Sequence, residues 1–193
     1  MISKPDKLVP MPKIHILDMR QILANIDHGN YDYDQTKWHC GTSHCVAGWK
    51  EWRDYTKAHA VGRVAREKLL KDSVYNHTIS LRRWRYEQFP QGEFGPDQKT
   101  LVPTVYKYAA RAWGMTKYEA SDMFDGEADL ALMRQITDLF MKGLRKVQHG
   151  PNFEHEEHPD YTFRDAWIDP NNPPVWFIEK VNNMDLMMED LFL

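Results

Sequence analysis

The chain has 193 residues, of which 42% are hydrophobic and 27% are charged, and its formal net charge at pH 7 is −3. These values are typical of one globular domain with a buried core, and they exclude an intrinsically disordered chain and a generally polyanion-binding surface. The sequence has no apolar run near the roughly 18 residues that cross a membrane, no hydrophobic signal region at its N-terminus and only two cysteines. We therefore expect a cytoplasmic protein without a membrane partner.

The sequence divides into three parts. Residues 1–13 contain three prolines and predict an extended N-terminal arm, because proline is excluded from helix interiors. Residues 14–150 repeat apolar side chains at helical spacing and predict the main helical domain. Residues 151–193 predict an acidic linker followed by a C-terminal apolar segment. The predicted fold class is mainly α: a compact domain of about five helices with an irregular middle loop and a C-terminal appendage.

Start and stop signals place these helices along the chain. The predicted ranges are 14–26, 44–70 with or without a break near residue 60, 104–113, 116–124 and 130–147. Thr42 or Ser43 can cap the second helix, and Gly114 ends the third. Thr116 and Glu119 have the spacing of a capping box, which predicts the start of the fourth helix. Residues 73–103 lack a clear period and contain several glycines and prolines, so we expect a long loop there with a strand or a helical turn.

Charge is distributed unevenly along the chain. Residues 50–85 contain ten Lys or Arg and four Asp or Glu, whereas residues 151–193 contain two and ten. Opposite charges on two parts of one chain can attract each other. We expect the apolar C-terminal segment to pack on the body of the protein, with the basic 50–85 region as one possible surface. The alternative is a Met-rich docking surface for a partner.

The segment from Trp38 to Trp49 has the most unusual composition in the chain. Two cysteines and two histidines lie within seven residues: His39, Cys40, His44 and Cys45. The first interpretation is structural, with the cysteines as small buried side chains at the start of a helix. The second is a zinc or iron–sulfur site using Cys40, Cys45, His39 and His44. Because adjacent His-Cys pairs chelate poorly, one residue of each pair would act with distant histidines.

The third interpretation of this segment is thiol chemistry. It places Cys45 about three residues into a helix, where the helix dipole and His44 would lower the pKa of the thiol. The sequence supplies no recognisable orienting acid or oxyanion hole for such a nucleophile. Substitution of Cys45 by Ser separates the three interpretations by loss of metal, loss of activity or a small change in stability.

The run Cys-Gly-Thr-x-x-Cys-x-Ala-Gly-Trp, from Cys40 to Trp49, resembles the signature of a group of uncharacterised small bacterial and phage proteins. The segment from Ala112 to Phe124 is similar to a Leu-Gly-Leu-Thr segment of that group. The likeness covers about residues 14–56 and 105–143. It implies a helical fold and a phage origin, and it implies no reaction.

An Arg-rich and aromatic cluster marks the middle of the chain. Its members are Arg82, Arg83, Trp84, Arg85 and Tyr86. Arginine with aromatic residues is typical of single-stranded nucleic-acid surfaces, which neutralise phosphates and stack bases. The alternative is a solvated helix or loop face whose aromatic side chains point into the core.

The sequence thus favours a non-enzymatic, phage-encoded helical accessory or interaction protein with no cofactor and with either a protein partner or self-association. The second hypothesis is a metalloprotein that binds zinc or an iron–sulfur centre through Cys40 and Cys45. The third is a single-stranded nucleic-acid-binding module.

Overall fold

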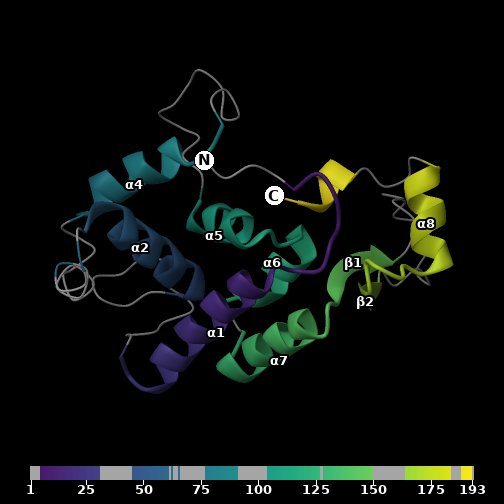
Figure 1. Cartoon of the computed structure of the whole chain (residues 1–193), viewed down its shortest axis with the longest axis horizontal. Coiled ribbons are helices and arrows are strands. Elements are labelled where there is room, and N and C mark those ends of the chain that lie inside the picture. Colours follow the sequence, from purple (N-terminus) through teal and green to yellow (C-terminus); the bar gives the residue numbers. More distant parts are fainter. Residues whose placement is uncertain are drawn as a thin grey trace.

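The computed structural model describes residues 5–30, 45–60, 62, 65, 77–90, 104–126, 128–149, 164–183 and 188–192. In these residues it has seven α-helices, one 3-10 helix and one two-stranded sheet (Figure 1). The α-helices are α1 (Lys13–Asp27), α2 (Val46–His59), α4 (Thr78–Glu87), α5 (Val105–Trp113), α6 (Lys117–Phe124), α7 (Leu130–Met141) and α8 (Val175–Asn182). The strands β1 (Arg145–His149) and β2 (Arg164–Ile168) are followed at the C-terminal end by η2 (Met188–Leu191). The prediction of a mainly helical fold is confirmed, with seven described α-helices where about five were expected.

The ends of α5 and α6 are set by the residues that the sequence indicated. The Thr104 side chain accepts a hydrogen bond from the Lys107 backbone N–H at 3.1 Å and caps α5. Gly114 ends α5 with a left-handed φ of 65°, which glycine adopts without steric cost. The Thr116–Glu119 capping box is present in full, with a bond in each direction. Local chemistry therefore fixes this turn between the two helices.

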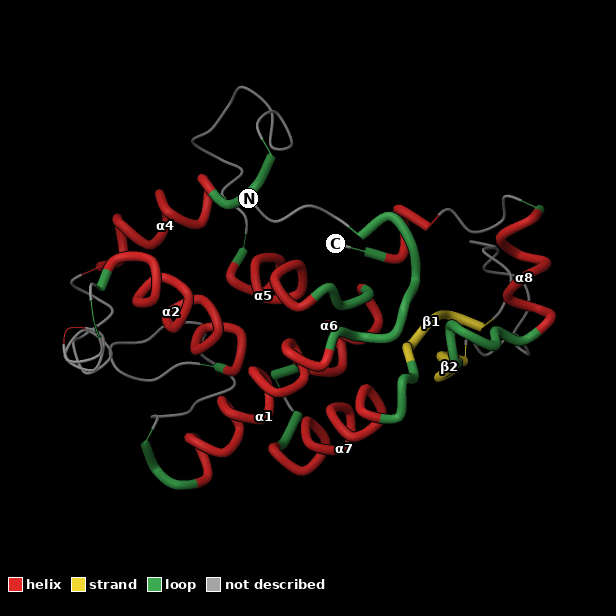
Figure 2. Tube along the Cα trace, viewed as in Figure 1, coloured by secondary structure: helices red, strands yellow, loops and turns green. Residues whose placement is uncertain are grey.

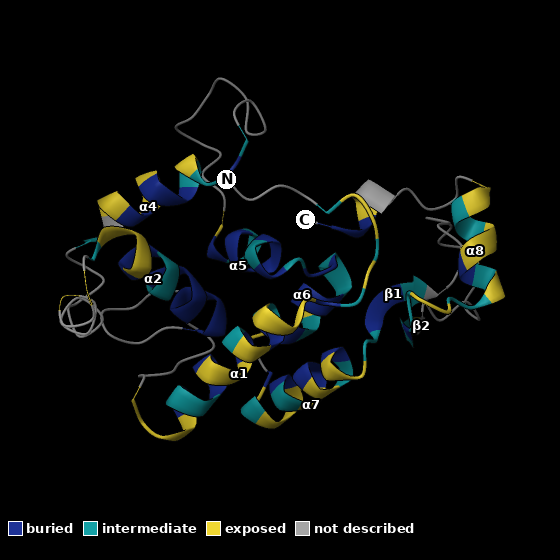
Figure 3. Ribbon diagram, viewed as in Figure 1, coloured by how far each residue is buried: buried dark blue, intermediate teal, exposed yellow. Residues whose placement is uncertain are grey.

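The main core lies between α1, α2, α5, α6 and α7, and Figure 3 marks the buried and the exposed residues along these helices. Helix α2 packs on α5, α1 and α4, while α1 also packs on α7. The largest side chains that are almost fully buried include Trp52, Trp113, Phe140, Met19, Met123 and Met133. Burial of this apolar surface is the main force that holds the short helices together, since isolated helices of this length are marginal in water.

Two helix predictions need correction. The helix predicted over 130–147 ends at Met141, because Gly143 turns the chain with a φ of 80° and residues 145–149 pair as a strand. Helix α2 begins at Val46 with Cys45 as its N-cap, instead of a cap at Thr42 or Ser43. Val147, which has the apolar spacing of the predicted helix, is therefore a strand residue. It is fully buried in the second core cluster.

The irregular region expected over 73–103 contains helix α4. Its apolar face is narrow: Leu81 and Trp84 are buried, while Arg82, Arg83 and Glu87 are exposed. Few core contacts are needed to hold a ten-residue helix against a larger body, so few of its residues are apolar. The apolar residues therefore show only a weak helical period in the sequence.

The described residues of the C-terminal part pack on β1, the arm and α6. Strand β2 pairs antiparallel with β1, in the register Val147 with Ala166, so the predicted linker contributes a strand (Figure 2). The second core cluster joins Val147, Ile168, Phe177, Leu191 and Phe192, with Leu8 of the arm and Tyr118 of α6 against it. Phe192 also forms an isolated bridge with Thr116. The C-terminal segment packs within the molecule, as expected, but on the sheet, the arm and α6.

The N-terminal arm is irregular over residues 5–12 and runs past α6 toward η2 (Figure 1). Met11 is buried in the main core and Leu8 packs on the second cluster, so the arm links the two. Among the described residues, no helix is long and apolar enough to span a membrane.

Candidate functional site

A cavity of about 510 Å³ lies beside the N-terminal arm, where the arm meets the start of α1, the end of α5 and the start of β1. It is lined by Pro5, Asp6, Lys7, Val9, Pro12, His15, Arg111, Gly114 and Arg145. Lys7, Arg111 and Arg145 are cationic, and Asp6 is the one carboxylate among the lining residues that the structure describes. The volume lies within the range of about 300–1,000 Å³ that is usual for ligand sites.

Arg145 forms the inner wall of this pocket. Only 2% of the residue is exposed, and its Nε and Nη2 donate to the two carboxylate oxygens of Glu119, each at 2.8 Å. Nη1 donates to the Val9 carbonyl at 2.6 Å, and Nη2 also donates to the Gly114 carbonyl at 2.7 Å. A guanidinium has five N–H donors, so one N–H on Nη1 has no acceptor among the described residues. Because Val9 and Gly114 both line the pocket, the guanidinium lies at its surface.

Glu119 compensates this buried charge and connects three elements. It is completely buried, and besides Arg145 it accepts from the backbone N–H groups of Thr116 and Lys146, each at 2.8 Å. Thr116 in turn donates its hydroxyl to the Lys146 carbonyl at 2.8 Å. A buried carboxylate is stable only when it is paired and hydrogen-bonded, and Glu119 meets both conditions. The pair therefore joins the start of α6 to β1 and to the arm.

Arg111 and His15 complete the pocket from the helices. Arg111 is 5% exposed in the last turn of α5, where a cation is favoured by the helix dipole, and its guanidinium lies 5.0 Å from the Phe89 ring centre. His15 donates from Nδ1 to the Trp113 carbonyl at 3.0 Å, which leaves its Nε2 without a partner among the described residues. Lys7 is exposed on the arm. The four basic side chains thus come from the arm, α1, α5 and β1.

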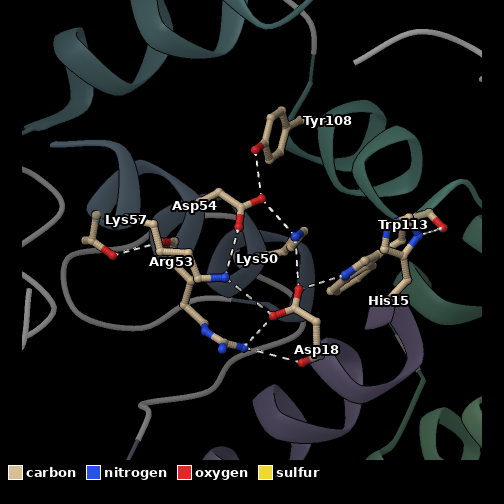
Figure 4. A network of polar contacts seen from close by, with 9 residues as sticks. His15, Asp18, Lys50, Arg53, Asp54, Lys57, Tyr108 and Trp113 are labelled. Carbon is tan, nitrogen blue, oxygen red and sulfur yellow. Dashed lines mark hydrogen bonds and ion pairs between the residues drawn. The ribbon is translucent and has the colours of Figure 1, made fainter. Parts of the chain in front are cut away.

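A second polar network lies between α1, α2 and α5 (Figure 4). Asp18 of α1 accepts from Lys50 at 2.9 Å and from the Trp113 indole N–H at 3.0 Å, and it forms an ion pair with Arg53 at 3.0 Å. Burial by itself raises the pKa of Asp18, but the nearby Lys50 charge, the bonds from Lys50 and Trp113 and the Arg53 charge outweigh it. The pKa of Asp18 is consequently below its ordinary value.

Lys50 and Tyr108 extend the same network on the other side. Lys50 lies between two carboxylates, with its ammonium 2.8 Å from Asp54 and 2.9 Å from Asp18. The Tyr108 hydroxyl donates to Asp54 at 2.9 Å. Burial first, and then the charge and bond of Asp54, raise the pKa of Tyr108 far above its ordinary value, so the phenol stays protonated as a donor. These groups hold three helices together with their charges mutually satisfied.

Cys45 is the one residue of the predicted Cys/His site that the structure describes. It is 2% exposed, and its Sγ accepts from the Gly48 backbone N–H at 3.4 Å. Burial raises the pKa of this thiol to about 11. The expected lowering of the pKa is therefore wrong, because Cys45 caps the helix from a buried position, where desolvation outweighs the helix dipole. His39, Cys40 and His44 lie outside the described residues.

The predicted nucleic-acid cluster is divided between the core and the surface of α4. Trp84 is buried, with its ring 5.8 Å from Tyr55 and 5.2 Å from Tyr108. Arg85 is also buried and donates to both carboxylate oxygens of Glu51 on α2. Arg82 and Arg83 are exposed, and Arg83 pairs with Glu87; Tyr86 is half-buried. The structure thus does not bring the five side chains onto one surface, since Trp84 and Arg85 face the body.

The pocket residues are ones that the sequence did not indicate. Lys7, His15, Arg111 and Arg145 are spread over nearly 140 positions and match no motif. The available signal was weak: Arg111 is a cation on the otherwise apolar buried face of a predicted helix, and a charged residue in such a place needs a partner.

Among the described residues, no group of three or more His, Cys, Asp or Glu side chains could hold a metal ion. The metal prediction is not tested by this observation, because three of its four residues lie in the undescribed segment. No family model matches the chain, and comparisons with curated proteins and with solved structures find no similar one. The resemblance of the Cys40–Trp49 run to the bacterial and phage group stays a prediction from sequence.

Proposed function

We propose that this chain is a non-enzymatic interaction protein that binds an anionic group of its partner in the basic pocket beside the N-terminal arm. One observation carries the proposal: two arginines that are at least 95% buried, Arg111 and Arg145, line an open cavity together with Lys7 and His15. One N–H of Arg145 has no acceptor among the described residues and can donate to such a group, because little water competes for a buried donor.

The burial and pairing of the groups that could act as nucleophiles or bases favour a binding function over covalent chemistry. Cys45 is buried and its thiol has a raised pKa of about 11. Lys50 is held between Asp18 and Asp54, and Tyr108 donates its hydroxyl to Asp54. None of these three lines the pocket. The residues that do line it are suited to attract and orient a charged group.

The test measures anion binding at low ionic strength with a matched pair of lysine variants. Sodium acetate and sodium phosphate are titrated into the full chain, and the backbone amides of the lining residues are followed by NMR. We expect shifts at Lys7 and Gly114 that saturate, and we expect Lys7→Gln to weaken binding about three- to tenfold. Lys13→Gln removes the same charge from an exposed lysine outside the pocket and should leave binding unchanged. Equal effects of the two variants, or no shift at the lining residues, contradict the proposal.

The competing proposal is a zinc or iron–sulfur protein that uses Cys40 and Cys45 with His39 and His44. It predicts about one equivalent of metal in untagged protein and its loss in Cys45→Ser. Elemental analysis with a visible spectrum decides between the two proposals, because an iron–sulfur centre absorbs in the visible and zinc does not. Stoichiometric metal bound by Cys45 would replace the interaction role as the proposed function. A cytoplasmic location and a phage origin are part of the first proposal and rest on the sequence alone.

A further inference from the structure

We infer that two copies of this chain associate through the outer edge of β2, so that their two-stranded sheets join into one antiparallel sheet of four strands. The outer edge of β2 is the side of this strand that faces away from β1 (Figure 2). The inference goes beyond the proposed anion pocket and does not depend on it. It rests on where the backbone N–H and C=O groups of the two strands point, and on which of them have partners.

The hydrogen bonds of Lys146 show which backbone groups of β2 point outward. The Lys146 N–H donates to Glu119 at 2.8 Å and its carbonyl accepts from the Thr116 hydroxyl at 2.8 Å, so both groups point away from β2. Lys146 lies opposite Trp167 in the antiparallel register. Because pairs with and without hydrogen bonds alternate along such a ladder, the backbone groups of Trp167 and Asp165 point away from β1. In the part of the chain that the structure describes, these groups have no hydrogen-bond partner.

Helix α6 lies along the opposite edge of the sheet, beside β1. Besides the two bonds to the Lys146 backbone, the Tyr118 hydroxyl donates to the Gln148 side chain at 2.8 Å. An incoming strand therefore meets α6 at β1. At β2 it meets unpaired backbone groups, where Asp165 is exposed and Trp167 is half-buried. Unpaired N–H and C=O groups at a sheet edge are the groups to which a further strand adds.

The outer edge of β2 is complementary to itself. Antiparallel pairing about a two-fold axis at Ala166 sets Asp165 of each copy opposite Trp167 of the other, and each of these two pairs exchanges two N–H···O bonds. The two Ala166 residues face each other in a pair without hydrogen bonds, where the strands come closest and a small side chain fits. A shift by two residues sets Asp165 opposite Asp165 or Asp169 of the second copy, and facing carboxylates destabilise a pair. The pairing centred on Ala166 is therefore favoured.

These features point to a second copy of the chain as the occupant of this edge. A two-fold pairing uses the same surface on both molecules. Since α6 covers the edge of β1, each copy presents one edge of the described sheet, and association ends at the dimer instead of continuing into a fibre. A two-stranded sheet is marginal by itself, whereas one with more strands and an apolar face is stable. Val147 and Ile168 supply that apolar face.

The experiment measures the mass of the full chain by sedimentation over a range of concentrations, with two variants at one position. Asp165→Pro removes an outward N–H and keeps the bonds between β2 and β1, because proline is tolerated where the N–H of an edge strand faces solvent. Asp165→Ala is the matched control: it loses the same ion pair with Lys146 but keeps the N–H. We expect a concentration-dependent wild-type dimer and a change of less than about twofold in Asp165→Ala. Asp165→Pro should associate at least about tenfold more weakly, because half of the bonds between the copies are lost.

Amide hydrogen exchange of the wild type tests the same contact without a substitution. It is followed by NMR at protein concentrations below and above the midpoint of dimer formation. The Asp165 and Trp167 amides should exchange more slowly at the higher concentration, because they gain acceptors from the second copy. The Gln148 amide is the internal control: it points outward from β1, on the side of α6, and its exchange should stay the same.

Each outcome supports or overturns the inference. A dimer that Asp165→Pro weakens and Asp165→Ala preserves, with slower exchange at the β2 edge, supports it. A wild-type monomer up to millimolar concentration overturns it, and so does a dimer that responds equally to the two variants. If circular dichroism shows that Asp165→Pro fails to fold, the exchange comparison decides. Slowing at Asp165 and Trp167 but not at Gln148 then supports the inference, and equal changes or no change at the three amides overturns it.

Discussion

The two buried ionic networks of this protein differ in what they hold. The network around Asp18 joins α1, α2 and α5 mainly through contacts between side chains: the hydrogen bonds from Lys50 and the Trp113 indole, and the ion pair with Arg53. The network around Glu119 and Arg145 ends largely on the backbone, at the N–H groups of Thr116 and Lys146 and at the carbonyls of Val9 and Gly114. The first network holds helices against one another, whereas the second holds segments that are not helical, namely the arm and β1.

The difference follows from the hydrogen bonds that each type of chain makes for itself. Helices satisfy their interior backbone groups, so only side chains need partners where α1 and α2 meet. The arm, with prolines at 5, 10 and 12, forms neither helix nor strand over residues 5–12 and depends on side chains such as Arg145. Arg145 binds the irregular backbone of the arm at Val9, and both Arg145 and Val9 line the pocket. The Glu119–Arg145 network is therefore the one that borders the pocket.

Glu119→Ala should have the largest effect on stability. It leaves Arg145 buried without its carboxylate and also removes half of the capping box of α6. Breaking a buried pair in this way costs about 3–5 kcal/mol in the free energy of unfolding, measured by urea denaturation. Amide hydrogen exchange in the arm should also accelerate, because Arg145 would no longer be held toward the Val9 carbonyl. A loss of stability below about 1 kcal/mol, with an unchanged arm, would contradict the assigned role.

The double variant Glu119→Leu with Arg145→Met sharpens this result. Replacing both charges with apolar groups removes the unpaired charge and should recover part of the stability lost in Glu119→Ala. The arm should still exchange rapidly, since Met has no donor for the Val9 carbonyl. Recovery of both stability and arm protection would show that the backbone bonds of Arg145 do not hold the arm.

Asp18→Asn should have a smaller effect, because Lys50 keeps its contact with Asp54 at 2.8 Å. We expect a loss of about 2 kcal/mol in the free energy of unfolding, from the weakened bonds of a mostly buried carboxylate. Hydrogen exchange in the arm should stay as in the wild type, since this network ends on helices. Accelerated exchange at residues 7–11 in this variant would remove the distinction between the two networks.

The lowered pKa of Asp18 predicts a pH dependence with a definite sign. A carboxyl whose pKa is lower in the folded state stabilises the fold above its unfolded pKa of about 3.9, and this contribution is lost as the pH falls through the folded pKa. The unfolding free energy of the wild type should therefore decrease below about pH 4. The decrease should be shallower in Asp18→Asn, and equal slopes in the two proteins would refute the assignment.

The smallest effect is expected at the surface of α4. Glu87→Gln breaks the ion pair between Glu87 and Arg83, whose side chains are 55% and 83% exposed, respectively. Exposed pairs of this spacing contribute less than about 0.5 kcal/mol, because water screens the charges. Urea denaturation in the same buffer makes this variant the surface control for the two buried networks. A loss comparable with that of Asp18→Asn would show that burial is not what separates the networks from surface pairs.

The local signals predicted the helix ends well where one residue acts on its own neighbours. Gly114 and the Thr116–Glu119 box act within a few residues, so their spacing is visible in the sequence. The prediction was wrong at Val147, because an apolar residue at helical spacing also suits a strand, and only the pairing with Ala166 decides between them. The burial of Cys45 was predicted, while its position as the N-cap and its raised pKa were not.

The sequence by itself determined a mainly helical chain, the turn between α5 and α6 and an irregular N-terminal arm, because these follow from propensity, capping and proline chemistry over short distances. Only the tertiary structure decided that Glu119, which is part of the capping box of α6, also binds Arg145. It likewise decided that Arg145 donates to the carbonyl of Val9, 136 positions earlier in the chain. Pairings over such distances depend on how the helices pack, and no local pattern encodes them. The pocket is formed by those pairings, so it first becomes visible in the folded molecule.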